Sequence, residues 1–125
     1  MTRLLIVAAA LAALSSAATA QSVPVTLSEW KIELPRDTVH AGSVTFRLKN
    51  EGNMVHGFHV TGAGVEKDAP QIAAGQSLSL TVTLKPGTYE LYCPMAELTH
   101  KQAGMVRKLT VIAGETPAAP KKPEF

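Results

Sequence analysis

Residues 77–93 read Ser-Leu-Ser-Leu-Thr-Val-Thr-Leu-Lys-Pro-Gly-Thr-Tyr-Glu-Leu-Tyr-Cys, and this stretch decides the fold. From 77 to 84 polar and apolar residues alternate strictly, which is typical of a β-strand with one buried face. Residues 85–87 predict a turn, because Pro fixes one φ angle and Gly frees the next. In the following strand one face carries Tyr89, Leu91 and Cys93. The stretch therefore predicts two consecutive strands, the second ending on an inward cysteine.

The same period-two pattern recurs along the chain. It is carried by Val44, Phe46 and Leu48, and again by Leu109 and Val111. Residues 23–27 and 30–34 alternate in opposite phases, so a bulge or strand break is expected near Ser28. Several short strands separated by Gly-rich turns predict an all-β antiparallel sandwich or barrel. One helical turn is possible at 96–102.

The first 20 residues have the pattern of a secretory signal peptide. Arg3 provides a short basic region, Leu4 to Leu14 are apolar, and residues 18–20 read Ala-Thr-Ala before Gln21. The apolar run is shorter than the roughly 20 residues that span a bilayer, so cleavage is favoured over an uncleaved anchor helix. We therefore expect an exported protein, in the periplasm or beyond.

The composition restricts the function classes. One Cys in 125 residues excludes an internal disulfide framework, a four-Cys zinc site and a C-x-x-C redox pair. The net charge of +2, which falls to +1 without Arg3, is too small to indicate nucleic-acid binding. Three prolines in residues 114–125 predict a flexible tail with two lysines. One domain remains at 21–113, with no second apolar stretch that could span a membrane.

Side chains that can bind a metal gather in two stretches. In the first, alternation places His56 on the apolar face with Phe58, whereas His59 points outward. The second stretch carries Cys93, Met95, Glu97, His100 and Met105. His40 lies outside both stretches, as a surface residue or part of an outer shell.

One thiolate, two imidazoles and a thioether form a donor set that suits copper, with Met as a weak axial ligand. Zinc could use the same two His and one Cys but gains little from a thioether. Haem attachment would need C-x-x-C-H, which is absent, and a nucleophilic Cys would need access to solvent. Cys93 alone could be an inert buried thiol. In an oxidising compartment, however, metal binding would explain why a free thiol is kept.

Two segments of the chain resemble the cupredoxins, the plastocyanin and azurin family. Pro-Gly-Thr-Tyr-Glu-Leu-Tyr-Cys93-Pro, followed by His100-x-x-x-Gly-Met105, is similar to the family's C-terminal copper loop. Asn50-Glu-Gly-Asn-Met-Val-His56-Gly-Phe is similar to the segment that carries its first histidine. The resemblance covers about 40–113. It implies a Greek-key β-sandwich of about seven to eight strands with one copper ion in a type 1, or blue copper, site.

Carried onto this sequence, the resemblance implies His56, Cys93 and His100 as equatorial ligands and Met105 as the axial ligand. It also implies that the amide of Gly57 donates a hydrogen bond to the Cys93 sulfur. The Cys-x6-His-x4-Met spacing is longer than in many members, and the loop holds two further possible axial ligands, which are Met95 and Glu97. Gly104 would let the backbone bend closely past the metal.

The resemblance implies an electron carrier that cycles between Cu(II) and Cu(I) and serves redox protein partners, rather than an enzyme. A multicopper oxidase would need more histidines than the four present. The edge of His100 is expected to reach the surface, where electrons would pass, among Met95, Ala96 and Leu98. Outward-facing Tyr92 is either a second, remote exit or an ordinary strand residue.

Two alternatives stay open from the sequence. One is a copper carrier or resistance protein that binds Cu(I) through Met and His side chains, namely Met54, Met95, Met105, His56 and His59. The other is a metal-free sandwich that acts as a binding module. In each case we expect a monomer, and a domain of this size should fold without a metal.

Overall fold

The computed structural model describes residues 21–114, which form nine strands and one short helix. The elements are β1 (Gln21–Ser28), β2 (Lys31–Glu33), β3 (Thr38–His40), β4 (Gly42–Asn50), β5 (His59–Gly62), β6 (Val65–Asp68), β7 (Ser77–Leu84), β8 (Gly87–Tyr92), α1 (Thr99–Ala103) and β9 (Val106–Ile112). The predicted signal segment at 1–20 and residues 115–125 of the predicted tail lie outside the described part of the chain.

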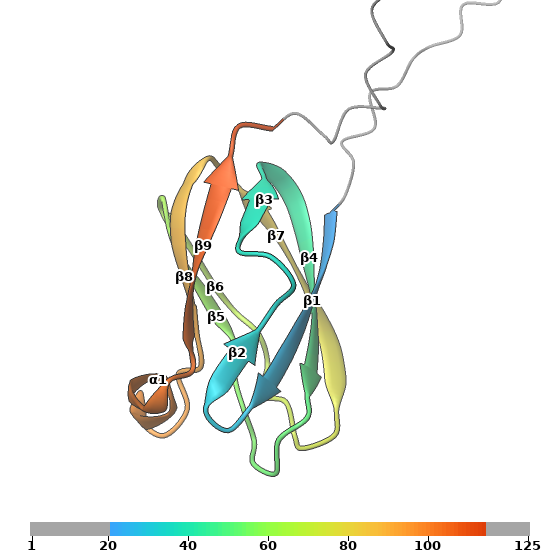
Figure 1. Cartoon of the computed structure of the whole chain (residues 1–125), viewed down its shortest axis with the longest axis vertical. Helices are drawn as coiled ribbons and strands as arrows, with labels where there is room; N and C mark the ends of the chain where they lie inside the picture. The colour runs from blue at the N-terminus through green and yellow to red at the C-terminus, as the bar shows by residue number, and fades with distance from the viewer. Residues whose placement is uncertain (1–20, 115–125) are drawn as a thin grey trace, which may run out of the picture.

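The strands form two sheets that pack face to face as a sandwich (Figure 1). The first sheet has the order β2-β1-β4-β7 and the second β3-β9-β8-β5-β6. The chain crosses between the sheets after β2, β3, β4, β6 and β7. The predicted all-β sandwich is confirmed, and neither sheet closes into a barrel.

Two strand pairs depart from the predicted antiparallel arrangement. β1 pairs with β4 in parallel, and β3 pairs with β9 in parallel. Short turns join antiparallel neighbours, whereas strands joined by a longer crossover can run parallel. The chain visits β3 in the opposite sheet between β1 and β4, so the β1–β4 pair is of the second kind. The count also exceeds seven to eight, because 28–40 contributes two short strands to different sheets.

Alternation places the core between the sheets. On β4, Val44, Phe46 and Leu48 are buried, whereas Arg47 and Lys49 are exposed. Burying one such apolar side chain stabilises the fold by about 1.5–3 kcal/mol. A one-residue slip of register would turn the whole apolar set toward solvent, so the pattern fixes which face is inside.

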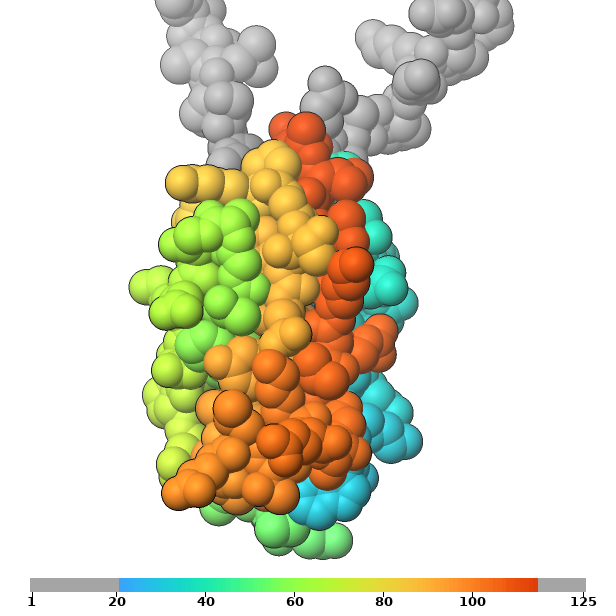
Figure 2. All heavy atoms as spheres, turned by 90° about the vertical axis from the view of Figure 1, so that its left-hand side faces the viewer, coloured from blue at the N-terminus to red at the C-terminus, as the bar shows by residue number. Residues whose placement is uncertain are grey.

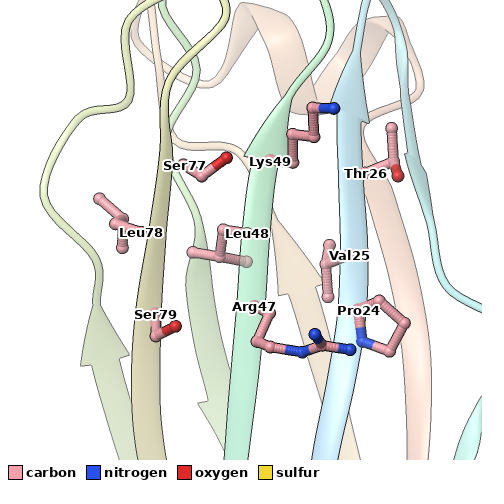
Figure 3. Close-up of a pocket in the computed structure, with 9 residues that line it drawn as sticks. All are labelled: Pro24, Val25, Thr26, Arg47, Leu48, Lys49, Ser77, Leu78 and Ser79. Atoms are coloured by element: carbon pink, nitrogen blue, oxygen red, sulfur yellow. The ribbon is translucent and has the colours of Figure 1, made fainter.

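The outer face of the first sheet is polar and carries a shallow groove (Figure 3). Arg47 and Lys49 of β4 stand in its centre, opposite Pro24 and Thr26 of β1 and opposite Ser79 and Ser77 of β7. The groove therefore lies on a solvated sheet face, away from the inward-facing histidines and cysteine.

The strand break expected near Ser28 is present and forms a tight hairpin. β1 ends at Ser28, which pairs with Lys31 at the start of β2. Glu29 and Trp30 are left as the two turn residues between the strands. The turn lies at the same end of the sandwich as α1, whereas β1 begins and β9 ends at the opposite end (Figure 1).

Three loops crowd the α1 end of the molecule. They are the β1–β2 turn, the loop after β4 and the segment from β8 through α1 to β9. Figure 2 shows the orange atoms of the last segment packed beside the blue atoms of the β1–β2 hairpin. Within the described part of the chain, no helix combines the length and the apolar character that a membrane crossing requires.

Candidate metal centre

His56 lies at the end of the loop that follows β4. Its backbone N–H donates to the carbonyl of Ile72 at 3.1 Å, and the N–H of Ile72 donates back at 2.8 Å. The side chains of His56, Phe58 and Val60 are all fully buried. The inward placement expected from alternation is confirmed, and this two-bond bridge fixes where the imidazole enters the core.

Asn50 holds the loop that leads to His56, and the sequence pattern gave no signal for this role. Its side chain is fully buried. Its amide nitrogen donates to the carbonyls of Met54 at 2.7 Å and Ile72 at 2.8 Å. Its amide oxygen accepts the N–H of Gly52 at 2.9 Å. The buried side-chain amide of Asn50 therefore supplies hydrogen bonds that the backbone of this irregular loop cannot make within itself.

Cys93 continues the inward row of β8 and brings a thiol into the core. Its side chain is fully buried. The N–H of Gly57 donates to the Cys93 sulfur at 3.3 Å, so the expected donor is confirmed. A Cβ at position 57 would lie 3.1 Å from Cδ of Pro94, which is closer than ordinary packing. Glycine at position 57 therefore lets the two ligand segments approach each other.

The segment after Cys93 turns sharply before it reaches His100. Ala96, Glu97 and Leu98 all have positive φ, at 54°, 52° and 70°. The predicted helical turn begins only at Thr99, because this left-handed stretch precedes it. α1 then buries His100, whose relative exposure is 5%.

Gly104 ends the helix with φ 133°, and a Cβ there would lie 2.6 Å from the carbonyl oxygen of Trp30. The sequence predicted a close approach of Gly104 to the metal, whereas the close approach in the structure is to the β1–β2 turn. Gly104 allows the segment from β8 to β9 to pack directly against that turn.

The predicted ligands meet at one buried point. The Cys93 sulfur lies 4.0 Å from Nδ1 of His56 and 3.7 Å from Nδ1 of His100. The three ligand atoms lie within 4.8 Å of one another. Met105 is fully buried and adjoins them through its backbone, since its N–H donates to the His100 carbonyl and its carbonyl accepts from Cys93, each at 3.1 Å.

This donor set fits copper. A thiol, two imidazole nitrogens and a nearby thioether combine soft and borderline donors, which copper prefers in both oxidation states. Their burial excludes competing water. His56, Cys93, His100 and Met105 are positioned for a copper site.

The other candidate side chains lie outside this cluster. Glu97 and Met54 are exposed, and Met95 is half-buried against the core. His59 points outward as predicted, and its Nδ1 contacts the carboxylate of Asp68. The backbone of His40 is hydrogen-bonded to the side chain of Gln21, and its Nδ1 has no hydrogen-bond partner among residues 21–114.

The β1–β2 turn contacts both histidines, which the sequence analysis missed. The Glu29 carboxylate lies 3.2 Å from Nε2 of His56. The ring of Trp30 meets His100 edge-on, with centroids 4.9 Å apart. Turn residues follow no sequence period. Only the charge of Glu29 and the aromatic ring of Trp30 could have marked these two residues as candidate neighbours of the site.

Burial and charge bias the protonation of the site. Burial lowers the pKa of His100, and the charge at His56 lowers it further, while Glu29 acts in the opposite direction. This imidazole is therefore more fully neutral at pH 7, the form that binds metals. Hydrogen bonding, first from its own backbone N–H, lowers the pKa of Glu29, although burial opposes the change.

Large apolar side chains are exposed on the loops around the cluster. The exposed large apolar side chains on its loops are Trp30, Met54, Val55 and Leu98. The expectation that the His100 edge itself reaches the surface is only partly met, since His100 is 5% exposed and its neighbour Trp30 is 41% exposed. The turn residue therefore supplies much of the surface next to this histidine.

The family model described as "Cupredoxin-like domain" matches residues 2–106. No curated protein sequence matches the chain.

Solved structures with the same fold include blue copper proteins. Reduced auracyanin from Roseiflexus castenholzii is 16% identical, with a TM-score of 0.61 over 74% of this chain and 97% of that one. A reduced, Cu(I) form of an amicyanin variant is 26% identical, with a TM-score of 0.52 over 73% and 82%. A chain of a heme-copper terminal oxidase is 17% identical, with a TM-score of 0.59 over 79% and 68%. The fold thus occurs both in small copper proteins and in an oxidase.

Proposed function

The chain belongs to the cupredoxin-like family, and from that premise we propose that it carries single electrons on one copper ion held by His56, Cys93, His100 and Met105. The observation that carries the proposal is the buried triad, whose ligand atoms lie within 4.8 Å of one another. When bound, copper supplies a one-electron change between Cu(II) and Cu(I).

In this proposal the protein holds its ligands in one arrangement for both oxidation states. Both histidines present Nδ1 to the Cys93 sulfur, which suits a trigonal site of two His and one Cys. The Gly57 N–H on the sulfur and the Asn50 bonds behind His56 restrain the ligands. A restrained site changes little on electron transfer, so the barrier to transfer stays low.

We assign the axial position to Met105. Its side chain is fully buried and adjoins His100 through the backbone. Glu97 is exposed and lies in the left-handed turn, and Met95 is half-buried. A weak thioether ligand at this position is typical of blue copper electron-transfer sites.

Electrons would pass through the apolar surface beside His100. Trp30 and Leu98 are 41% and 42% exposed there. A redox protein with an apolar docking face is the partner that this surface suits, and the low net charge predicts only modest electrostatic steering. We propose a monomeric carrier rather than an enzyme, although the fold also occurs within the oxidase chain.

We further propose export to the periplasm or beyond, with residues 1–20 as the signal, 21–113 as the copper domain and 114–125 as the tail. The support is the n-region, the apolar run and the cleavage pattern of the N-terminus. Intact-mass measurement on protein secreted by a bacterial host tests the assignment. A mass equal to that of a chain beginning at Gln21 supports the assignment, and a mass that includes residues 1–20 contradicts it.

The optical spectrum tests the main proposal. Copper-loaded protein should show an intense visible thiolate-to-copper band and a reversible one-electron wave. Both should disappear in Cys93→Ser, whereas Ser79→Ala in the groove of the first sheet should retain them. A colourless Cu(II) form of the unaltered protein would contradict the type 1 site.

A copper carrier remains the second candidate, because the Met54 thioether is exposed at the same end as the buried cluster. A carrier would pass Cu(I) to an acceptor chelator and would tolerate Cys93→Ser but not Met54→Leu. An electron carrier would keep its copper while it is oxidised and reduced, and would tolerate Met54→Leu.

A further inference from the structure

Glu29, in the turn between β1 and β2, has its carboxylate against a proposed copper ligand. One oxygen, Oε1, lies 3.2 Å from Nε2 of His56. The same oxygen accepts the backbone N–H groups of Asn53 at 2.8 Å and Met54 at 2.9 Å. The Glu29 side chain is 23% exposed, so it is partly shielded from water.

Two features of the loop after β4 fix the position of the Glu29 carboxylate. The backbone N–H groups of the loop after β4 hold the carboxylate whether or not His56 contributes. Gly52 leaves the necessary room, since a Cβ at position 52 would lie 2.6 Å from each carboxylate oxygen. The His56 contact is therefore part of a preorganised arrangement.

We propose that Glu29 is a positioning residue for His56, which fixes its tautomer and favours Cu(II) over Cu(I). A carboxylate can only accept a hydrogen bond, so Nε2 of His56 carries the proton. Nδ1, which faces the Cys93 sulfur, is then left with its lone pair free for a metal. The inference rests on the proposed function and assigns a role to a residue outside the ligand set.

The direction of the effect on the reduction potential follows from charge. Cu(II) carries one more positive charge than Cu(I), so a fixed negative charge behind a ligand stabilises the oxidised state more. The hydrogen bond of Glu29 to the imidazole keeps its charge directly behind the ligand, where solvent screens it less than it screens a fully exposed charge. Removing the charge should therefore raise the potential.

Glu29→Gln tests the charge with the least change in structure. Gln keeps the length of the side chain and one acceptor oxygen, and it removes the negative charge. The matched control is Glu33→Gln, because Glu33 is an exposed carboxylate in the same hairpin and pairs with Lys31 at 3.2 Å. Far-UV circular dichroism checks that both variants fold.

We expect Glu29→Gln to lower the binding affinity for Cu(II), relative to that for Cu(I), by about tenfold. This is the lower end of the change in metal affinity that follows the loss of a partner behind a ligand. For one electron, that ratio raises the midpoint potential by about 59 mV. Glu33→Gln should shift the potential by far less. A shift in Glu29→Gln no larger than that of the control overturns the effect on the potential.

The tautomer is measured on the unaltered protein and needs no variant. Nitrogen-15 NMR of the metal-free protein should find the His56 proton on Nε2, and a proton on Nδ1 overturns the positioning role. This readout does not depend on electron transfer. A protonated Nε2 without a visible band in the Cu(II) form would overturn the proposed function alone, whereas a visible band with a protonated Nδ1 would overturn only the role of Glu29.

Discussion

At the scale of single residues, the site depends on groups that hold the ligand segments in place as well as on the ligands themselves. Asn50 satisfies two carbonyls and one N–H of the His56 loop. Gly57 gives its N–H to the Cys93 sulfur. Each replaces a hydrogen bond that a regular strand would have made, and each is buried, so its loss cannot be repaired by water.

Replacing Asn50 should destabilise the domain and loosen copper together. Asn50→Leu removes the side-chain partner of the Met54 carbonyl and of the Gly52 N–H, and one of the two donors to the Ile72 carbonyl. A group that is left unsatisfied and shielded from water costs about 1–3 kcal/mol. We expect a loss of at least about 2 kcal/mol in the free energy of unfolding, measured by urea titration of the apo protein. Asn53→Ala, at an exposed position of the same loop, should cost little. Equal effects of the two variants would contradict this role.

At the scale of elements, the segment between Cys93 and His100 is a strained connection. Ala96, Glu97 and Leu98 adopt positive φ although none is glycine. The helix that follows has only five residues, too few to be stable alone. The burial of His100 and an ion pair between Lys101 and Glu90, at 2.5 Å, hold it against β8.

Glycine within this turn should stabilise the protein. A non-glycine residue in the left-handed region costs about 1–2 kcal/mol, which exceeds the extra entropy that glycine loses on folding. Glu97→Gly should therefore raise stability by about 0.5–1 kcal/mol, seen as a higher melting temperature in calorimetry. Gln102→Gly, in the right-handed helix, should lower it by a similar amount. A lower melting temperature for Glu97→Gly would exclude the strain.

At the scale of the whole molecule, the two ends of the sandwich differ. The end with α1 carries the metal-binding cluster and the exposed apolar side chains around it. At the opposite end, where β9 finishes, the described residues include one large apolar side chain of similar exposure, Ile112 at 42%. Most side chains of the apolar core between the two sheets are not proposed metal ligands, so the fold should form without the metal.

Copper should raise the melting temperature of a domain that is already folded. A ligand that binds only the native state adds about 2.7 kcal/mol of stability at a free concentration of 100 times its Kd. We expect cooperative melting of the apo protein and a higher melting temperature with copper, and no increase in Cys93→Ser. Equal melting temperatures for the apo and copper-loaded protein would contradict tight binding.

Docking of a redox partner on the α1 end can be tested by placing one lysine at each end of the molecule. Leu98→Lys places a charge in the apolar surface, and Ile112→Lys places one at an equally exposed position of the far end. Because two copies meet through the same surface in self-exchange, Leu98→Lys should slow electron self-exchange about tenfold or more. Ile112→Lys should leave the rate nearly unchanged, and both variants should keep the visible band. A similar loss in both would exclude the apolar surface as the site of transfer.

The sequence by itself determined the sandwich fold and the inward direction of the main candidate metal ligands. Period-two alternation is a local property, and it placed Val44, Phe46 and Leu48 in the core and His56 and Cys93 on inward faces. It also located the strand break near Ser28, because the phase of the pattern changes there. The copper prediction followed from donor chemistry and from a resemblance carried by the spacing after Cys93.

Only the tertiary structure decided what surrounds those candidates. The parallel pairing of β1 with β4 joins strands that are distant in sequence, and no local pattern encodes it. The pairing brings the turn residues Glu29 and Trp30 against His56 and His100. Turns and buried polar contacts follow no sequence period. Their hydrogen bonds depend on which backbone groups remain unpaired once the strands have formed. The ligand set could therefore be predicted from the chain, whereas the groups that orient it could be found only in three dimensions.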